Sequence, residues 1–164
     1  MYNDIPVIKG DSGDNKVEIL GNSIINGDVD LGAGADNLLV SNGTQINGDL
    51  FGGEGIDSLQ LGNGIHNESH PLNNYDSNGD GVIDKGDWRG LAVYNSISEF
   101  ENINVGGSVT LYETAKINGD TNIHIGAGGS LNLRIDPTKK DLAGRVIGHA
   151  LYSEGNKVIT AEKH

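Results

Sequence analysis

A repeat of 21 residues in the first part of the chain limits the folds that are open to it. The tetrapeptide INGD occurs at residues 25–28, 46–49 and 117–120, and the first two copies are 21 residues apart. Many other positions recur at the same offset. They are Gly13, Gly34 and Gly55, then Asn15, Asp36 and Asp57, then Val17, Leu38 and Leu59, and then Ile19, Val40 and Leu61. Three consecutive units therefore share one pattern.

The pattern inside each unit is that of a short strand. Apolar residues alternate, as at Leu38 and Val40, and clusters of Gly, Asn and Asp that favour tight turns surround them. A unit of this length cannot bury its apolar side alone, so it must stack on copies of itself. We therefore expect an all-β fold, a right-handed parallel β-helix (β-solenoid) of about six coils, with matching residues in ladders about 4.8 Å apart.

The composition agrees with a repetitive fold. The 164 residues include 26 glycines but only two phenylalanines and one tryptophan, so large side chains for a two-layer core are scarce. Acidic residues outnumber basic ones by 23 to 11, and the resulting charge of −12 argues against nucleic acid as a partner. The chain has no cysteine, which excludes disulfides and thiol chemistry.

The strand pattern resumes after residue 95. Alternating apolar residues separated by Gly, Asn or Thr continue through FENINVGGSVTL and IHIGAGGSLNLRI, and the last predicted strand contains Val158 and Ile159. His124 lies between Ile123 and Ile125 and is expected to face solvent. We divide the chain into N-terminal coils at 1–65, an insertion at 66–95 and C-terminal coils at 96–164.

The segments FENINV, GSVTL, IHIGAGGSLNLRID and GHAL resemble the closing coils of the passenger domains of type V autotransporter adhesins. The resemblance covers residues 96–152 best and the 21-residue units more loosely. It implies a parallel β-helix displayed outside the outer membrane of a bacterial cell, without cofactor chemistry, that attaches to a cell-surface protein or glycan of host or bacterial origin. The membrane barrel of that family is not in this sequence. We therefore expect a monomeric fragment that meets a membrane only through that barrel.

Residues 76–87, DSNGDGVIDKGD, interrupt the solenoid pattern and match an EF-hand calcium loop. The predicted Ca²⁺ ligands are Asp76, Asn78, Asp80, the carbonyl of Val82, Asp84 and Asp87. Closely spaced carboxylates repel one another unless a cation lies between them, and Gly81 stands where such a loop turns sharply. Asp87 replaces the usual glutamate, as in the dockerin loops that this string resembles.

An insertion in a solenoid must leave the stack on one side, so residues 66–95 are expected to form a side loop. Bound calcium would offset the entropy lost when this polar segment becomes ordered. The segment GDWRGLAVYNSI, at residues 86–97, could form one short helix after the loop.

A second cation hypothesis concerns the repeats. GGEGIDSLQ at Gly52–Gln60 matches the calcium-binding RTX nonapeptide, and LGAGADNLL at Leu31–Leu39 matches it except at the first glycine. These units carry one nonapeptide per 21 residues, whereas RTX coils carry two. We therefore expect polar turns without metal at Asp36 and Asp57, and additional calcium there stays an open alternative.

The expected function is attachment by a calcium-stabilised β-helical segment, without enzyme activity. His66 and His70 are four residues apart, but the glutamate between them and Pro71 do not fit a zinc-binding helix. Two alternatives stay open. One is a structural stalk that binds nothing, and the other is a β-helical polysaccharide lyase or hydrolase, which would need carboxylates or a basic residue gathered at a cleft.

Overall fold

The computed structural model of the chain describes residues 6–20, 23–62, 91–93, 95–112, 115–127, 129–134, 138, 140, 142–145 and 155–162. Within these residues every regular element is a β-strand, of two to five residues, and none is a helix. The described part consequently contains no helix with the length and apolar character that crossing a membrane requires.

The strands form three sheets in which all pairings are parallel. Sheet A contains β1 (Ile8–Lys9), β4 (Val29–Asp30), β7 (Leu50–Phe51), β10 (Ile97–Ser98) and β13 (Ile117–Asn118). Sheet B contains β2 (Lys16–Ile19), β5 (Asn37–Val40), β8 (Ser58–Leu61), β11 (Asn102–Val105), β14 (Thr121–Ile125) and β16 (Lys157–Ala161). Sheet C contains β3 (Ile24–Ile25), β6 (Gln45–Ile46), β9 (Leu91–Val93), β12 (Ser108–Tyr112) and β15 (Ser130–Arg134).

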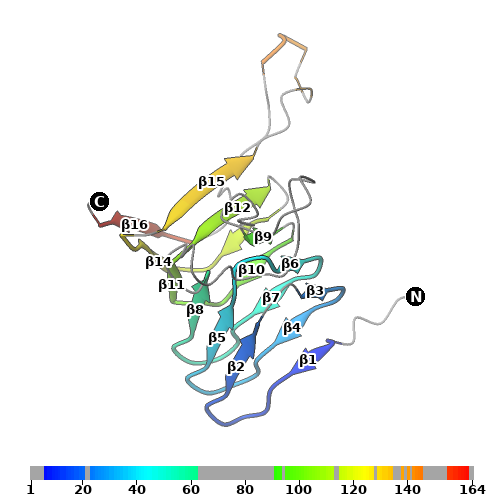
Figure 1. Ribbon diagram of the computed structural model, residues 1–164, viewed down its shortest axis with the longest axis vertical. Helices are drawn as coiled ribbons and strands as arrows, with labels where there is room; N and C mark the ends of the chain where they lie inside the picture. The colour runs from blue at the N-terminus through cyan, green and yellow to red at the C-terminus, as the bar shows by residue number, and fades with distance from the viewer. Residues whose placement is uncertain are drawn as a thin grey trace, which may run out of the picture.

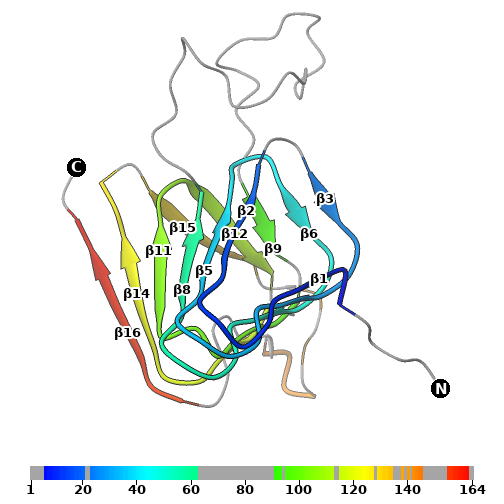
Figure 2. The ribbon, with the colours of Figure 1, turned by 90° about the horizontal axis from the view of Figure 1, so that it is seen from below.

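From β1 to β15, successive strands enter sheets A, B and C in turn, so the chain passes repeatedly through the same three sheets. We call one such passage a circuit; β4, β5 and β6, for example, form the second. Neighbouring strands of a sheet come from consecutive circuits, which lie above one another in Figure 1. Figure 2 shows the strands of sheet B side by side on one side of the molecule and β3, β6 and β9 on the other. This arrangement is compatible with the expected solenoid.

The register confirms the ladders predicted from the repeat. Val17 pairs with Leu38 and Leu38 with Leu59, and the ladder that begins at Ile19 continues in the same way. Because side chains alternate across a strand, these ladders point inward while the residues between them point outward. Leu38 is 1% exposed and Leu59 is fully buried.

The core consists of inward ladders from all three sheets. Sheet A contributes a column of Val29, Leu50, Ile97 and Ile117, each in register with the next. Sheet C contributes Ile46, Val93 and Leu111. All of these side chains are buried. Each buried Leu or Ile contributes roughly 1.5–3 kcal/mol relative to an exposed one, so a molecule with few aromatic residues can still be stable.

The three INGD copies occupy two different corners of the circuit. Ile25 pairs with Ile46 in sheet C, whereas Ile117 lies in sheet A and pairs with Ile97. In each copy the glycine connects two sheets and the aspartate directly precedes the next strand. INGD therefore encodes a way of turning a corner, not a fixed place in the circuit.

Aspartates at these corners accept backbone N–H groups from neighbouring circuits, in two ladders of opposite direction. At the start of sheet A, the carboxylate of the earlier circuit accepts from the later one. Asp28 Oδ1 accepts from Asp49 N, and Asp49 Oδ1 from Ser96 N, both at 2.8 Å. Before β5 and β8 of sheet B, the carboxylate belongs to the later circuit. Asp36 Oδ1 accepts from Asn15 N at 2.7 Å, and Asp57 Oδ1 from Asp36 N at 2.8 Å.

One sequence expectation needs correction. Leu91–Val93 falls inside the segment considered as a short helix, but it forms β9, which pairs in parallel with β6 and β12. A helix through the whole of residues 86–97 is therefore wrong, because ladder pairing requires an extended backbone. The chain is back in the sheets at Leu91, inside the insertion predicted over 66–95. The part of that insertion before β9, residues 66–90, lies outside the described residues.

Candidate binding groove on sheet B

The predicted calcium ligands belong to the part of the chain between β8 and β9. Asp76, Asn78, Asp80, Val82, Asp84 and Asp87 all lie outside the described residues, as do His66 and His70. Among the residues that the structure does describe, no group of three or more His, Cys, Asp or Glu side chains could hold a metal ion. The candidate sites that can be described come instead from the outer face of sheet B and from its first residues.

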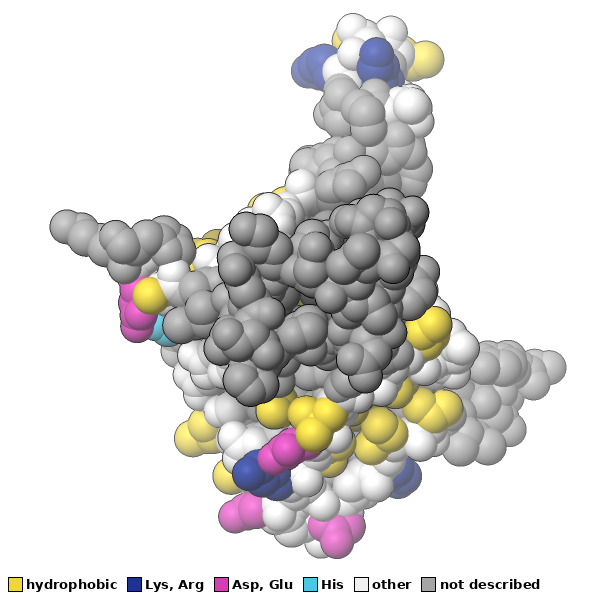
Figure 3. All heavy atoms as spheres, viewed as in Figure 1, with side chains coloured by type: hydrophobic (Ala, Val, Ile, Leu, Met, Phe, Trp, Pro, Cys, Tyr) yellow, Lys and Arg dark blue, Asp and Glu magenta, His cyan; other side chains and the backbone are white. Residues whose placement is uncertain are grey.

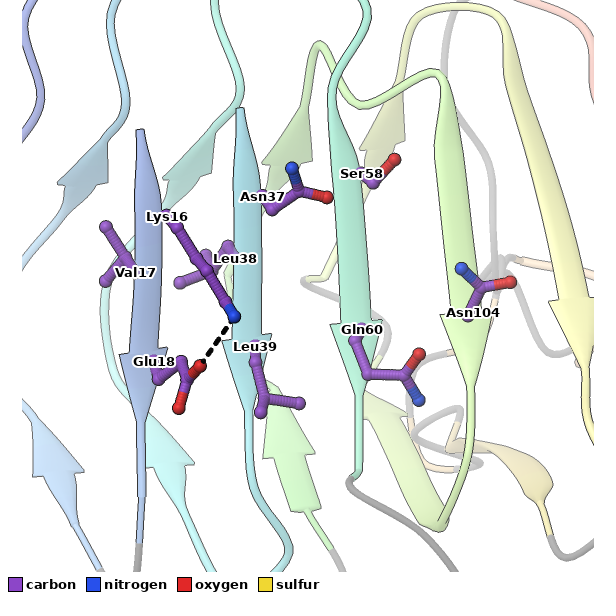
Figure 4. A pocket seen from close by; sticks show the side chains of 9 residues that line it. All are labelled: Lys16, Val17, Glu18, Asn37, Leu38, Leu39, Ser58, Gln60 and Asn104. Atoms are coloured by element: carbon purple, nitrogen blue, oxygen red, sulfur yellow. Dashed lines mark ion pairs between the residues drawn. The ribbon is translucent and has the colours of Figure 1, made fainter. Parts of the chain in front are cut away.

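A groove of about 490 Å³ lies on the outer face of sheet B, across the first four strands. Its lining residues come from β2, β5, β8 and β11 and are drawn in Figure 4. They are Lys16, Val17, Glu18, Asn37, Leu38, Leu39, Ser58, Gln60 and Asn104. Most belong to two outward rows, because alternate residues of each strand point away from the core. In one row Lys16, Asn37 and Ser58 are in register, and in the other Glu18, Leu39, Gln60 and Asn104.

The charges of the groove neutralise each other at its N-terminal end. Lys16 Nζ lies 3.2 Å from Glu18 Oε1, and both side chains are well exposed. An exposed pair of this kind contributes little to stability, about 0–1 kcal/mol. The rest of the lining is uncharged. A ligand in the groove therefore meets amide and hydroxyl groups and the apolar side chain of Leu39.

The polar groups of the groove are available to a ligand. Within the described part of the chain, no hydrogen bond engages the side chains of Asn37, Ser58 and Asn104. Gln60 Nε2 donates to the carbonyl of Gly62 at 2.7 Å, which fixes the orientation of that amide. Each amide or hydroxyl can both donate and accept, so the groove suits a neutral ligand with many hydroxyl or amide groups.

The second outward row continues beyond the groove to the end of sheet B. There His124 lies 3.0 Å from Thr160 Oγ1 through Nδ1 and 3.1 Å from Glu162 Oε1 through Nε2. Glu162 Oε2 in turn accepts from the backbone N–H of Ala127 at 3.1 Å. His124 is on the outer face, as its alternation with Ile123 and Ile125 predicts, and these contacts fasten β16 to β14.

Asp36 and Asp57 directly precede β5 and β8 and lie next to each other in the stack. Asp36 is 1% exposed and Asp57 is fully buried. Burial raises the pKa of Asp57, the hydrogen bond from Asp36 N–H lowers it, and the neighbouring carboxylates of Asp36 and Glu101 raise it further. The sequence predicted polar turns here. In the structure the carboxylates of Asp36 and Asp57 do accept hydrogen bonds from backbone N–H groups of the turns, but both carboxylates are buried in the interior.

Sequence reasoning missed the groove. The repeat drew attention to inward positions such as Leu38 and Leu59, where conserved apolar character within the repeat makes the ladder visible. The outward positions differ between units, with Asn37 beside Ser58 and Leu39 beside Gln60. Their only signal is that each lies one residue away from a core position, which predicts orientation but no concave shape.

The face of the molecule in Figure 3 has a different character from the groove. Apolar side chains gather over the N-terminal circuits there, with acidic and basic side chains scattered around them. Exposed large apolar side chains of these circuits include Val7, Leu20, Ile24 and Ile56.

Comparison with known proteins adds no identification. The sequence matches no protein-family model, and no curated protein or solved structure is detectably similar to it. A function for this chain must therefore be argued from the groove, the buried aspartates and the sequence motifs.

Proposed function

We propose that this chain is a segment of a surface-displayed bacterial adhesin, and that it attaches by holding a neutral glycan in the groove of sheet B. The proposed fold is a right-handed parallel β-helix of about six coils. The described strands support it, because they pass five times through sheets A, B and C before β16 adds to sheet B. The resemblance to autotransporter passenger domains supports an extracellular location.

The observation that carries the proposal is the uncharged polar lining of the groove. In the described part of the chain, the side chains of Asn37, Ser58 and Asn104 have no hydrogen-bond partner, and they belong to neighbouring strands that line the groove. Sugar hydroxyl groups donate and accept hydrogen bonds, as these amides and this hydroxyl do. Leu39, in the middle of the second row, offers an apolar surface for the C–H groups of a sugar ring. Strands spaced about 4.8 Å apart would let successive sugars meet successive circuits.

The acidic residues of the groove favour binding of a glycan over its hydrolysis. Hydrolysis of a glycoside needs two carboxyl groups on opposite sides of the scissile bond. Glu18 is the carboxylate among the residues that line the groove, and it is paired with Lys16. We therefore place a polysaccharide hydrolase or lyase behind attachment, and turnover of an acidic polysaccharide in calcium would reverse that order.

Glycan binding can be tested with matched variants. Purified protein is screened on a glycan array in calcium, and hits are measured by calorimetry. Asn37→Ala combined with Gln60→Ala is expected to weaken binding by about tenfold or more, since each lost hydrogen bond contributes about 0.5–1.5 kcal/mol. Asn132→Ala, an exposed amide on sheet C, is the control and should bind normally. Absence of glycan binding, or equal binding by the double variant, would contradict the proposal and favour a stalk.

The calcium loop at residues 76–87 belongs to the same proposal, on the support of its sequence motif. We expect calcium to order the segment between β8 and β9, with Asp76 and Asp80 among the ligands. Trp88 adjoins the last predicted ligand, so its emission should change with millimolar calcium and return with EDTA. A shorter chain that lacks residues 66–90 but keeps β9 should lose this signal and keep the sheets. If that shorter chain still binds the glycan, the loop is not part of the attachment site.

A further inference from the structure

Asp36 and Asp57 each have one carboxylate oxygen to which no described residue donates a hydrogen bond. Their Oδ1 atoms accept backbone N–H groups from Asn15 and Asp36. Their Oδ2 atoms are buried and, within the described residues, have no hydrogen-bond partner. An ionised oxygen without a partner in the protein interior is strongly unfavourable.

The surroundings of these oxygens add negative charge. Asn15, Asp36, Asp57 and Glu101 occupy equivalent positions in the first four circuits, and we call them the aspartate column. Glu101 accepts the N–H of Asp57 through Oε2 at 2.7 Å. None of the ion pairs within the described residues involves Asp36 or Asp57; those pairs join Lys9 to Asp30, Lys16 to Glu18 and His124 to Glu162. The two buried carboxylates precede neighbouring strands and repel each other, and no ion pair within the described residues offsets this repulsion.

We propose that a hard divalent cation of the calcium type binds between the turns that precede β5 and β8, with Asp36 Oδ2 and Asp57 Oδ2 as its anionic ligands. Backbone carbonyls of these two turns would complete its shell of oxygen atoms. Calcium accepts six to eight oxygen ligands in irregular geometry, whereas magnesium requires a near-ideal octahedron and zinc prefers nitrogen or sulfur. Such a cation would supply the partner that both Oδ2 atoms lack.

The aspartate column explains why the site would be confined to these two circuits. The corresponding residue of the first circuit is Asn15, which is neutral. The corresponding residue of the fourth circuit is Glu101, which follows a shorter connection from sheet A, running from Ser98 to Asn102. The turns before β5 and β8 are longer, contain Gly32, Gly34, Gly53 and Gly55 at positive φ, and stack through the bridge between Ala33 and Glu54. Within the described residues, buried carboxylate oxygens without a partner occur only where these two stacked turns meet.

The test separates this site from the loop at residues 76–87 and does not depend on glycan binding. The loop is silenced with Asp76→Ala and Asp80→Ala in the full chain. Calcium binding is then measured by calorimetry, and thermal unfolding is recorded in calcium and in EDTA. The loop-silenced protein should still bind calcium, with a higher Tm in calcium than in EDTA, because a cation bound only to the folded state stabilises it.

Asp57→Asn in the loop-silenced protein removes the charge but keeps an oxygen for the N–H of Asp36. This change should abolish the calcium-dependent rise in Tm while leaving the Tm in EDTA at least as high as before, which shows that the variant folds. Asp36→Asn should weaken calcium binding by about tenfold or more. Asp49→Asn, in the ladder at the start of sheet A, is the control and should keep the calcium response. No calcium response in the loop-silenced protein, or an unchanged response in Asp57→Asn, would overturn the proposal.

Discussion

Glycine is required in the turns before β5 and β8, where one turn lies directly on another. Gly34 and Gly55 are equivalent positions with φ of 131° and 134°. A Cβ on Gly55 would lie 1.8 Å from the carbonyl oxygen of Gly34. Gly13 occupies the same position in the first circuit, but its nearest neighbour would be a side-chain oxygen of Asp11 at 3.5 Å. The repeat predicts a common role for these glycines, but the stacking leaves room for a side chain at Gly13 and none at Gly55.

Gly55→Ala is therefore expected to destabilise the protein, and Gly13→Ala is its matched control. The first change places a side chain in a backbone region that is almost reserved for glycine and against a neighbouring backbone, which costs at least about 1–3 kcal/mol. The second should stay within about 0.5 kcal/mol of the parent. Chemical denaturation at fixed calcium concentration measures both. Equal losses would mean that the turns before β5 and β8 do not stack as described.

At the scale of the strand, adjacent residues that point inward and outward contribute very differently to the free energy of unfolding. Leu38 and Leu39 are adjacent in β5, yet Leu38 belongs to the core and Leu39 lines the groove. Leu38→Ala should lower the free energy of unfolding by about 2–5 kcal/mol, since it leaves a cavity between Val17 and Leu59.

Leu39→Ala should change the free energy of unfolding by less than about 1 kcal/mol, because the side chain is on the outer face. The pair is compared by denaturation with the same readout. A similar loss for both variants would show that the outer face of sheet B is covered by protein, which would also contradict the open groove.

Strand positions in the first part of the chain could be predicted because the repeat and the alternation of apolar residues agree there. Leu38 and Leu59 meet as the 21-residue offset requires. Farther along, the offset no longer holds, since Ile97 pairs with Leu50 and with Ile117 at different separations. A copied tetrapeptide then becomes misleading, because local turn chemistry repeats at any corner. Concave shape on the outer face depends on how side chains of several circuits combine, and no single segment encodes it.

At the scale of the whole molecule, contacts run mainly between neighbouring circuits, so stability should vary along the stack. β16 pairs with β14 but is poorly covered, with Val158 54% and Ile159 47% exposed. β8 lies between β5 and β11, and its inward side chains are buried.

Native-state hydrogen exchange should therefore be uneven. Amides of β16 should exchange at least about tenfold faster than those of β8, because opening the last strand exposes little apolar surface. Mass spectrometry or NMR at constant calcium concentration can measure this, with β5 as the internal reference for a central strand. Uniform protection from β5 to β16 would mean that the stack opens only as a single unit.

The opposite directions of the two aspartate ladders have a consequence for how such a chain could assemble. At the start of sheet A the earlier circuit holds the acceptor, and before β5 and β8 of sheet B the later circuit holds it. The third circuit thus offers both an anion and a donor to each neighbour. It offers Asp57 Oδ1 and Asp49 N–H to the second circuit, and Asp49 Oδ1 and Asp57 N–H to the fourth. Growth need not begin at either terminus, because a nucleus in the middle would be able to recruit chain on both sides.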